Sequence, residues 1–100
     1  MFLAMNRFQI SKDHCSDFER IWRERDSYLE NVPGFKSFNL LRSSEHEDFV
    51  LYASHSVWED ESAFRAWTES KEFRLAHQQA SAPKGTYLAH PQLETFTSVL

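Results

Sequence analysis

FKSFNLLRSSEHEDFVLYASHSVW, residues 35–58, decides the fold. Apolar and polar side chains alternate over Phe35–Leu41 and again over Phe49–Trp58, and a period of two is typical of strands. The polar segment RSSEHED between them is too short for the crossover that parallel strands need. The centre of the chain is therefore predicted to be an antiparallel β-hairpin.

The segment before the hairpin predicts a strand followed by a helix. Residues 2–10 alternate, which indicates a first strand. Ser11 or Asp13 then offers an N-cap, and Pro33-Gly34 is a typical helix end. Between these signals, apolar and amphipathic residues recur at helical spacing: Phe18, Ile21, Trp22, Arg25, Tyr28, Leu29 and Val32.

The segment after the hairpin predicts two short helices and a last strand. Acidic residues 59–61 are favourable at a helix N-terminus, and Ser70 can cap a second helix that runs from Lys71 to about Gln79. SAPKG is expected to be a loop. The last strand is predicted over residues 86–100, where Pro91 restricts the first part to an edge or a bulge.

The order β-α-β-β-α-β predicts an α+β fold, a ferredoxin-like sandwich in which helices cover one face of a four-stranded antiparallel sheet. At 100 residues the chain is expected to form a single domain, residues 1–100. Its 15 aromatic residues are a large apolar load for this length. We therefore expect the uncovered sheet face to be buried in a homodimer.

Composition argues against several classes of partner. The formal net charge is −4, whereas nucleic-acid binding is driven by phosphate neutralisation, and no basic block would attract an anionic membrane. The lone Cys15 excludes an internal disulfide. Without a signal-peptide pattern or a run long enough to span a bilayer, the protein is predicted to be cytoplasmic.

Asn6 is unusual because it lies in the middle of a predicted strand, where Asn is depleted. A buried amide without a partner costs about 1–3 kcal/mol. One interpretation is that a neighbouring backbone group satisfies the amide. The other is that the amide points into a pocket and donates to a bound ligand.

Trp67 and His77 lie ten residues apart with a predicted helix break between them. Trp67 is interpreted as a core residue or as the wall of a site, and His77 as a helix-end residue or as a metal ligand. A zinc site needs three or four ligands, and the five histidines are scattered. A haem needs only one imidazole, because the porphyrin supplies four nitrogens. The chain has no phosphate-binding loop, no G-x-S-x-G motif and no activated Cys15 environment.

Four segments resemble the IsdG-type haem-degrading monooxygenases of the antibiotic biosynthesis monooxygenase (ABM) superfamily. They are NRF in the first strand, PGF after the first helix, VWEDESAFRAW, and SKEFRLAH. PGF and VW…F are shared across the superfamily and indicate the fold. The more specific part is an Asn in the first strand, a Trp in the penultimate helix and a His that closes the next helix, which here are Asn6, Trp67 and His77.

The resemblance implies a single ABM-type domain that pairs as a dimeric α+β barrel, with Asn6, Trp67 and His77 as the catalytic trio of a haem oxygenase. His77 would be the axial ligand of the haem iron, Trp67 would distort the porphyrin, and Asn6 would donate a hydrogen bond near the iron. A neutral imidazole leaves one iron position open for O₂. Because no flavin or nicotinamide motif is present, electrons would come from an external donor, a reductase or a small reductant.

Trp22, Arg25 and Phe64 are expected to bind the substrate. Trp22 and Arg25 lie about one turn apart on the same apolar stripe, and Phe64 neighbours Trp67 on its helix. Arg25 is interpreted either as the partner of a haem propionate or as a solvent-facing salt bridge. Two other functions fit the same fold: a cofactor-free quinol or polyketide monooxygenase, and a dimeric protein that binds haem without turnover.

Overall fold

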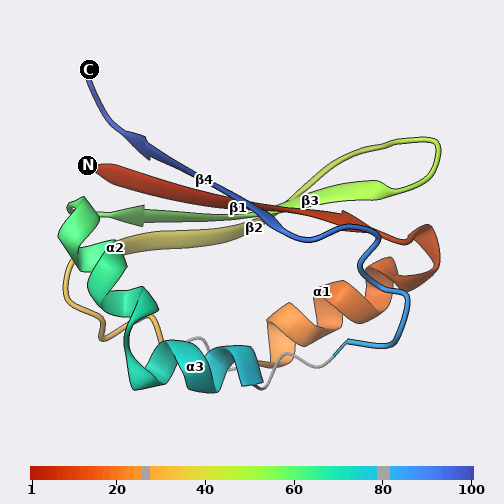
Figure 1. The fold of residues 1–100 in the computed structure, drawn as a ribbon, viewed down its shortest axis with the longest axis horizontal. Coiled ribbons are helices and arrows are strands. Elements are labelled where there is room, and N and C mark those ends of the chain that lie inside the picture. The colour runs from red at the N-terminus through yellow and green to blue at the C-terminus, as the bar shows by residue number, and fades with distance from the viewer. Residues whose placement is uncertain (26–27, 79–81) are drawn as a thin grey trace.

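The computed structural model describes residues 1–25, 28–78 and 82–100. One antiparallel sheet has the strand order β2-β3-β1-β4, where β1 is Phe2–Ile10, β2 Phe35–Glu45, β3 Val50–Trp58 and β4 Gln92–Thr97. Helices α1 (Cys15–Glu24), α2 (Glu61–Thr68) and α3 (Lys71–Gln78) lie on one side of it (Figure 1). The predicted α+β ferredoxin-like fold and its central antiparallel hairpin are confirmed.

The break between α2 and α3 occurs at Ser70, as predicted. Asp60 caps α2 by accepting a hydrogen bond from the Ala63 amide at 2.9 Å. The Ser70 hydroxyl accepts from the Phe73 amide at 3.1 Å and donates to the Trp67 carbonyl at 2.6 Å. One serine thus ends α2 and begins α3. The predicted end of the second helix at Gln79 lies outside the described residues.

The first helix is shorter than predicted. A 3₁₀ turn, Lys12–His14, precedes α1, which ends at Glu24 and not at Val32. Arg25 is already extended, at φ −76° and ψ 147°, and Tyr28 has a positive φ of 60° that a right-handed helix excludes. Leu29 is nevertheless buried, because the turn segment carries it against Trp58. Apolar spacing therefore predicted the burial of this segment correctly but its conformation wrongly.

The strand ends also differ from the predicted ones. β4 spans only Gln92–Thr97, not residues 86–100. Tyr87 makes one isolated bridge to Ile10, and Pro91 lacks the N–H that a continuous ladder would need. β2 runs past the predicted Leu41 to Glu45, with an irregular register after Arg42, so the hairpin turn is shorter than predicted.

The turn before β2 is fixed by Gly34. Its φ is +81°, which favours glycine, and a Cβ at this position would lie 2.5 Å from the Ala63 Cβ. The Gly34 carbonyl also accepts a hydrogen bond from the Glu59 amide at 2.7 Å. The PGF motif therefore brings this turn into contact with the start of α2.

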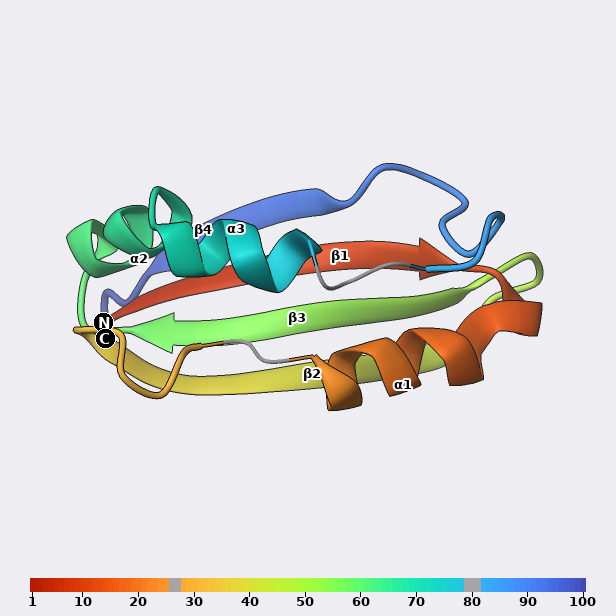
Figure 2. The same ribbon diagram turned by 90° about the horizontal axis from the view of Figure 1, so that it is seen from below.

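The two faces of the sheet have different partners. α1 covers the β2 side of the inner face, and α2 and α3 cover the β1 side (Figure 2). The outer face carries no helix (Figure 1). The register of β1 and β3 places Phe2 beside Trp58, and Phe8 beside Tyr52, on the inner face. Alternate residues of the same strands therefore point outward.

Buried residues of the inner face form two separate clusters. One surrounds Phe18 and Tyr52 under α1, and the other surrounds Trp58 and Trp67 under α2 and α3. Between the clusters, the register pairs Ala4 with Ser56 and Asn6 with Ser54. Small side chains thus occupy the middle of the sheet, where bulky ones would join the two clusters into a continuous core.

Candidate active site

A cavity of about 300 Å³ lies above these small residues, between the sheet and the helices. Its volume is at the lower end of the range that is typical of ligand sites, about 300–1,000 Å³. Aromatic rings from the sheet, from all three helices and from the segment before β4 contribute to its walls. All six predicted site residues line it: Asn6, Trp22, Arg25, Phe64, Trp67 and His77.

Asn6 lies on the cavity floor with a side-chain oxygen that is buried and has no hydrogen-bond partner in the described residues. The interpretation that a backbone group satisfies the amide is therefore wrong for this oxygen. Buried polar atoms are rarely left without a partner, and an unpaired one points to a missing partner or to a functional role. Asn6 Oδ1 is thus available to accept a hydrogen bond from a molecule in the cavity.

His77 is one residue from the end of α3, and this exposed residue lines the cavity. Its Nδ1 lies 2.8 Å from the Phe73 carbonyl oxygen, which can only accept, so Nδ1 is the protonated nitrogen. In the neutral ring, Nε2 then carries the lone pair. A backbone carbonyl that fixes the tautomer in this way is a common second partner of a metal-binding histidine.

Trp67 is both a core residue and a wall of the cavity. It is 7% exposed, stacks against Trp58 with ring centres 6.4 Å apart, and meets Phe73 edge to face at 5.5 Å. Phe64, one turn earlier, packs against Trp58 at 5.8 Å. Because Phe73 in turn contacts the His77 ring at 4.0 Å, the tryptophan and the histidine are held by one aromatic cluster.

Trp22 and Arg25 form the wall at the end of α1. The Trp22 ring stacks on Phe38 at 5.5 Å, and the Arg25 guanidinium lies 4.0 Å from the centre of the Trp22 ring. Burial lowers the pKa of Arg25, which still stays protonated at neutral pH. Its Nε is buried without a hydrogen-bond partner in the described residues, which argues against the solvent-facing salt bridge.

Other histidines lie elsewhere. His55 pairs in register with Met5 and therefore points to the outer face. His46 and His90 line a shallow outer depression with Arg7. Within residues 1–25, 28–78 and 82–100, no three His, Cys, Asp or Glu side chains are grouped closely enough to hold a metal. Among the histidines of the described chain, only His77 lines the cavity.

Comparisons with known proteins identify the family of this chain. The family model for antibiotic biosynthesis monooxygenase (ABM) matches residues 1–79. The chain belongs to this family. Its curated relatives include heme oxygenase (staphylobilin-producing) 1 of Staphylococcus aureus strain Newman, 31% identical over 78 residues, or 77% of this chain and 71% of the relative. The resemblance to IsdG-type enzymes is therefore confirmed.

Solved structures of ABM relatives match the whole chain. The heme-degrader MhuD from Mycobacterium tuberculosis, with two hemes bound in its active site, superposes with a TM-score of 0.76 at 25% identity, over 100% of this chain and 97% of that one. SnoaB, a cofactor-independent oxygenase from Streptomyces nogalater, was solved as the N63A mutant and superposes at 0.73. At 21% identity, over 99% of this chain and 93% of that one, SnoaB shows only the fold.

The residues of this ABM chain fit a haem. One imidazole nitrogen is free, the cavity is lined mainly by aromatic rings, and two buried polar atoms, Asn6 Oδ1 and Arg25 Nε, have no partner in the described residues. A flat apolar ring with one metal and peripheral carboxylates would use the imidazole nitrogen, the aromatic walls and the Arg25 donor. Asn6 Oδ1 can only accept, so its partner would be a hydrogen-bond donor in the cavity.

The lining residues that were not predicted as site residues include Phe38, Ser54, Ser56 and Tyr87. The two serines could have been predicted from the sequence. They occupy successive inner positions of β3 between the bulky Tyr52 and Trp58, and two small side chains there leave a gap in the packed face. No sequence pattern indicated Tyr87 as a lining residue, since it lies in a segment without regular structure.

Proposed function

We propose that this protein is a haem-degrading monooxygenase that cleaves the porphyrin ring with O₂ and external electrons, releasing iron and a linear tetrapyrrole. The observation that carries the proposal is the convergence of Asn6, Trp67 and His77 on one cavity, with the His77 tautomer fixed so that Nε2 is free. The family match and the relatives that bear heme-degrading names support it.

Each residue has a role that follows from its contacts. His77 holds the iron through Nε2 while Phe73 keeps the ring in place. Trp67, packed from behind by Trp58, presents a rigid surface against which the macrocycle lies. Asn6 offers its amide on the sheet side of the cavity. The haem supplies the iron that binds and activates O₂.

The surrounding aromatic rings exclude water from the reaction. Phe8, Phe38, Phe64 and Phe73 contribute apolar surface on several sides of the cavity. A dry cavity strengthens the hydrogen bond that the Asn6 amide makes and protects reactive oxygen species from side reactions. The proposed reaction takes its electrons from a separate reductant.

A cofactor-free monooxygenase is the second candidate. The structural likeness to SnoaB supports it at the level of the fold. In this alternative the cavity holds an aromatic substrate, Asn6 and Arg25 hydrogen-bond its oxygen atoms, and His77 is a polar wall. The free Nε2 at the cavity edge favours the haem reading.

A titration with hemin distinguishes these functions. We expect a Soret shift that saturates at one equivalent or a small integer, followed by Soret loss and iron release when ascorbate and O₂ are added. A Soret shift that persists under these conditions would indicate binding without turnover. The absence of any shift would contradict both haem functions and leave the cofactor-free alternative.

We also propose that the chain forms a homodimer through the outer face of the sheet. Two large apolar side chains of this face are well exposed, Leu41 at 42% and Phe96 at 50%. Monomeric proteins rarely expose a large contiguous apolar patch. The register places on it Leu3, Met5, Leu41, Leu51, Val57 and Phe96.

A further inference from the structure

Tyr87 lies on the rim of the cavity, beyond the residues that the family model matches. Its ring packs edge to face on Phe18 at 5.9 Å and against Phe8 at 6.2 Å, while the residue as a whole is 42% exposed. One part of the phenol is therefore fixed on the aromatic cluster, and the rest remains accessible. This is the position of a residue that meets the polar edge of a bound ligand.

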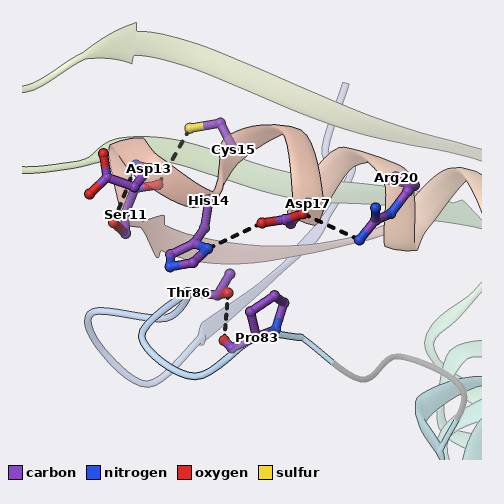
Figure 3. A network of polar contacts seen from close by, with 8 residues as sticks. All are labelled: Ser11, Asp13, His14, Cys15, Asp17, Arg20, Pro83 and Thr86. Atoms are coloured by element: carbon purple, nitrogen blue, oxygen red, sulfur yellow. Dashed lines mark hydrogen bonds and ion pairs between the residues drawn. The ribbon is translucent and has the colours of Figure 1, made fainter.

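The backbone beside Tyr87 is fixed to the rest of the fold. Thr86 is fully buried, its carbonyl accepts from the Ser11 amide at 2.9 Å, and its hydroxyl donates to the Pro83 carbonyl at 2.7 Å (Figure 3). On the other side, the Leu88 amide donates to the Gln9 carbonyl at 3.0 Å. These contacts hold Tyr87 in place before any ligand arrives, and such preorganisation lowers the entropy cost of binding.

Arg25 lines the same cavity, and its positive charge has no ion-pair partner among the described residues. Its guanidinium lies over Trp22, and none of the ion pairs of the described residues includes it. Arg25 lies over the Trp22 ring, and the Trp22 and Tyr87 rings both pack against Phe8 and Phe18, so the two groups share one wall of the cavity. Burial raises the pKa of Tyr87, and the positive charge of Arg25 partly opposes this rise. At neutral pH the pair presents a cation and a protonated phenol, which are both donors.

We propose that Arg25 and Tyr87 together bind one carboxylate of the ligand at the rim of the aromatic cavity. The guanidinium supplies the charge and the phenol supplies a second hydrogen bond to the same carboxylate. The two residues come from the end of α1 and from the segment before β4, which are far apart in sequence and converge only in the folded chain.

The chemistry of the two groups points to a carboxylate. A planar guanidinium matches the two oxygens of a carboxylate, and a charge-assisted hydrogen bond is stronger than a neutral one. The ligand would carry the acid on the edge of a flat apolar body, since the cavity behind the pair is aromatic. The inference rests on the proposed function in that the carboxylate is taken to be a haem propionate.

Binding of hemin and of its dimethyl ester, in which both propionates are neutral, tests the proposal. Quenching of tryptophan fluorescence reports affinity for each ligand, and Trp22, Trp58 and Trp67 all line the cavity. We expect Tyr87→Phe to weaken hemin binding about tenfold, in line with a hydrogen bond to a charged group, and to change ester binding less than about twofold. Tyr52→Phe removes a hydroxyl outside this cavity and should bind hemin like the parent.

A double-mutant cycle tests whether the two residues share one carboxylate. Arg25→Met and Tyr87→Phe should each weaken hemin binding, and the double variant should lose less than the product of the two single losses. Unchanged hemin affinity in Tyr87→Phe, or equal losses for hemin and ester, would overturn the proposal while the parent still binds hemin. A parent protein that binds neither porphyrin would instead overturn the proposed function, and the inference with it.

Discussion

Replacing Asn6 with leucine should make the ligand-free protein more stable and the enzyme inactive. The Asn6 oxygen is buried and unpaired in the described residues, and an unpaired buried polar group costs about 1–3 kcal/mol. Leucine has a similar size and would face the open cavity, so it introduces no clash. Because Asn6 as a whole is only half-buried, we expect the lower part of the range, a gain of about 1 kcal/mol in the free energy of unfolding.

Urea and thermal unfolding of the ligand-free protein measure this gain. For a chain of 100 residues, about 1 kcal/mol raises Tm by about 4–8 °C. Asn39→Leu makes the same exchange at an exposed strand position of the outer face, so it reports strand propensity and surface exposure together with any effect on the proposed dimer. A folded Asn6→Leu protein that is less stable than the parent would refute the reasoning, since the amide must then make a stabilising bond.

Three further predictions concern the proposed haem site and the dimer. His77→Ala should abolish haem degradation and the imidazole-ligated ferrous–CO spectrum, whereas His55→Ala, on the outer face, should keep both. The opposite result would show that His55, and not His77, is the axial ligand. Trp67→Phe should stay folded, as a circular-dichroism melt can verify, and should degrade haem more slowly, because a smaller ring presses less on the macrocycle; a parental rate would leave Trp67 as a core residue only. Sedimentation should give twice the chain mass of 11.8 kDa, and Val57→Asp on the outer face should give the monomer mass, so a monomeric parent would contradict the dimer.

Local signals predicted those parts of the fold in which one residue decides the local structure. Asp60 and Ser70 cap the helices at which the sequence places them, and Gly34 adopts the positive φ that a turn before a strand requires. Alternation predicted the hairpin because its inner face is buried, which fixes the register.

Sequence patterns failed where tertiary contacts determine the backbone. Apolar spacing continues through Tyr28 and Leu29, but a turn buries these side chains as well as a helix would, so periodicity alone could not distinguish the two. The last strand was predicted to begin at Thr86, which lies outside β4. Its hydroxyl instead donates to the nearby Pro83 carbonyl, and its carbonyl accepts from the Ser11 amide, a long-range bond that no local sequence pattern predicts.

The candidate site was partly predictable for the same reason. Asn6 is conspicuous because it breaks a strand pattern, and an amide in such a place needs a partner. Tyr87 and Phe38 break no pattern, so only the folded chain brings them to the cavity. Arg25 lies between these cases: its position on the apolar stripe was visible, but the absence of an ion-pair partner among the described residues was not.

The cavity itself follows from an unusual distribution of side-chain size. Ala4, Asn6, Ser54 and Ser56 occupy the middle of the inner sheet face, which in a domain of this size would normally hold the largest core residues. The buried residues on either side form two separate clusters, one under α1 and the other under α2 and α3. A ligand with a large flat apolar body would join them into one core. This geometry predicts that the proposed substrate, once bound, also raises the free energy of unfolding of the protein.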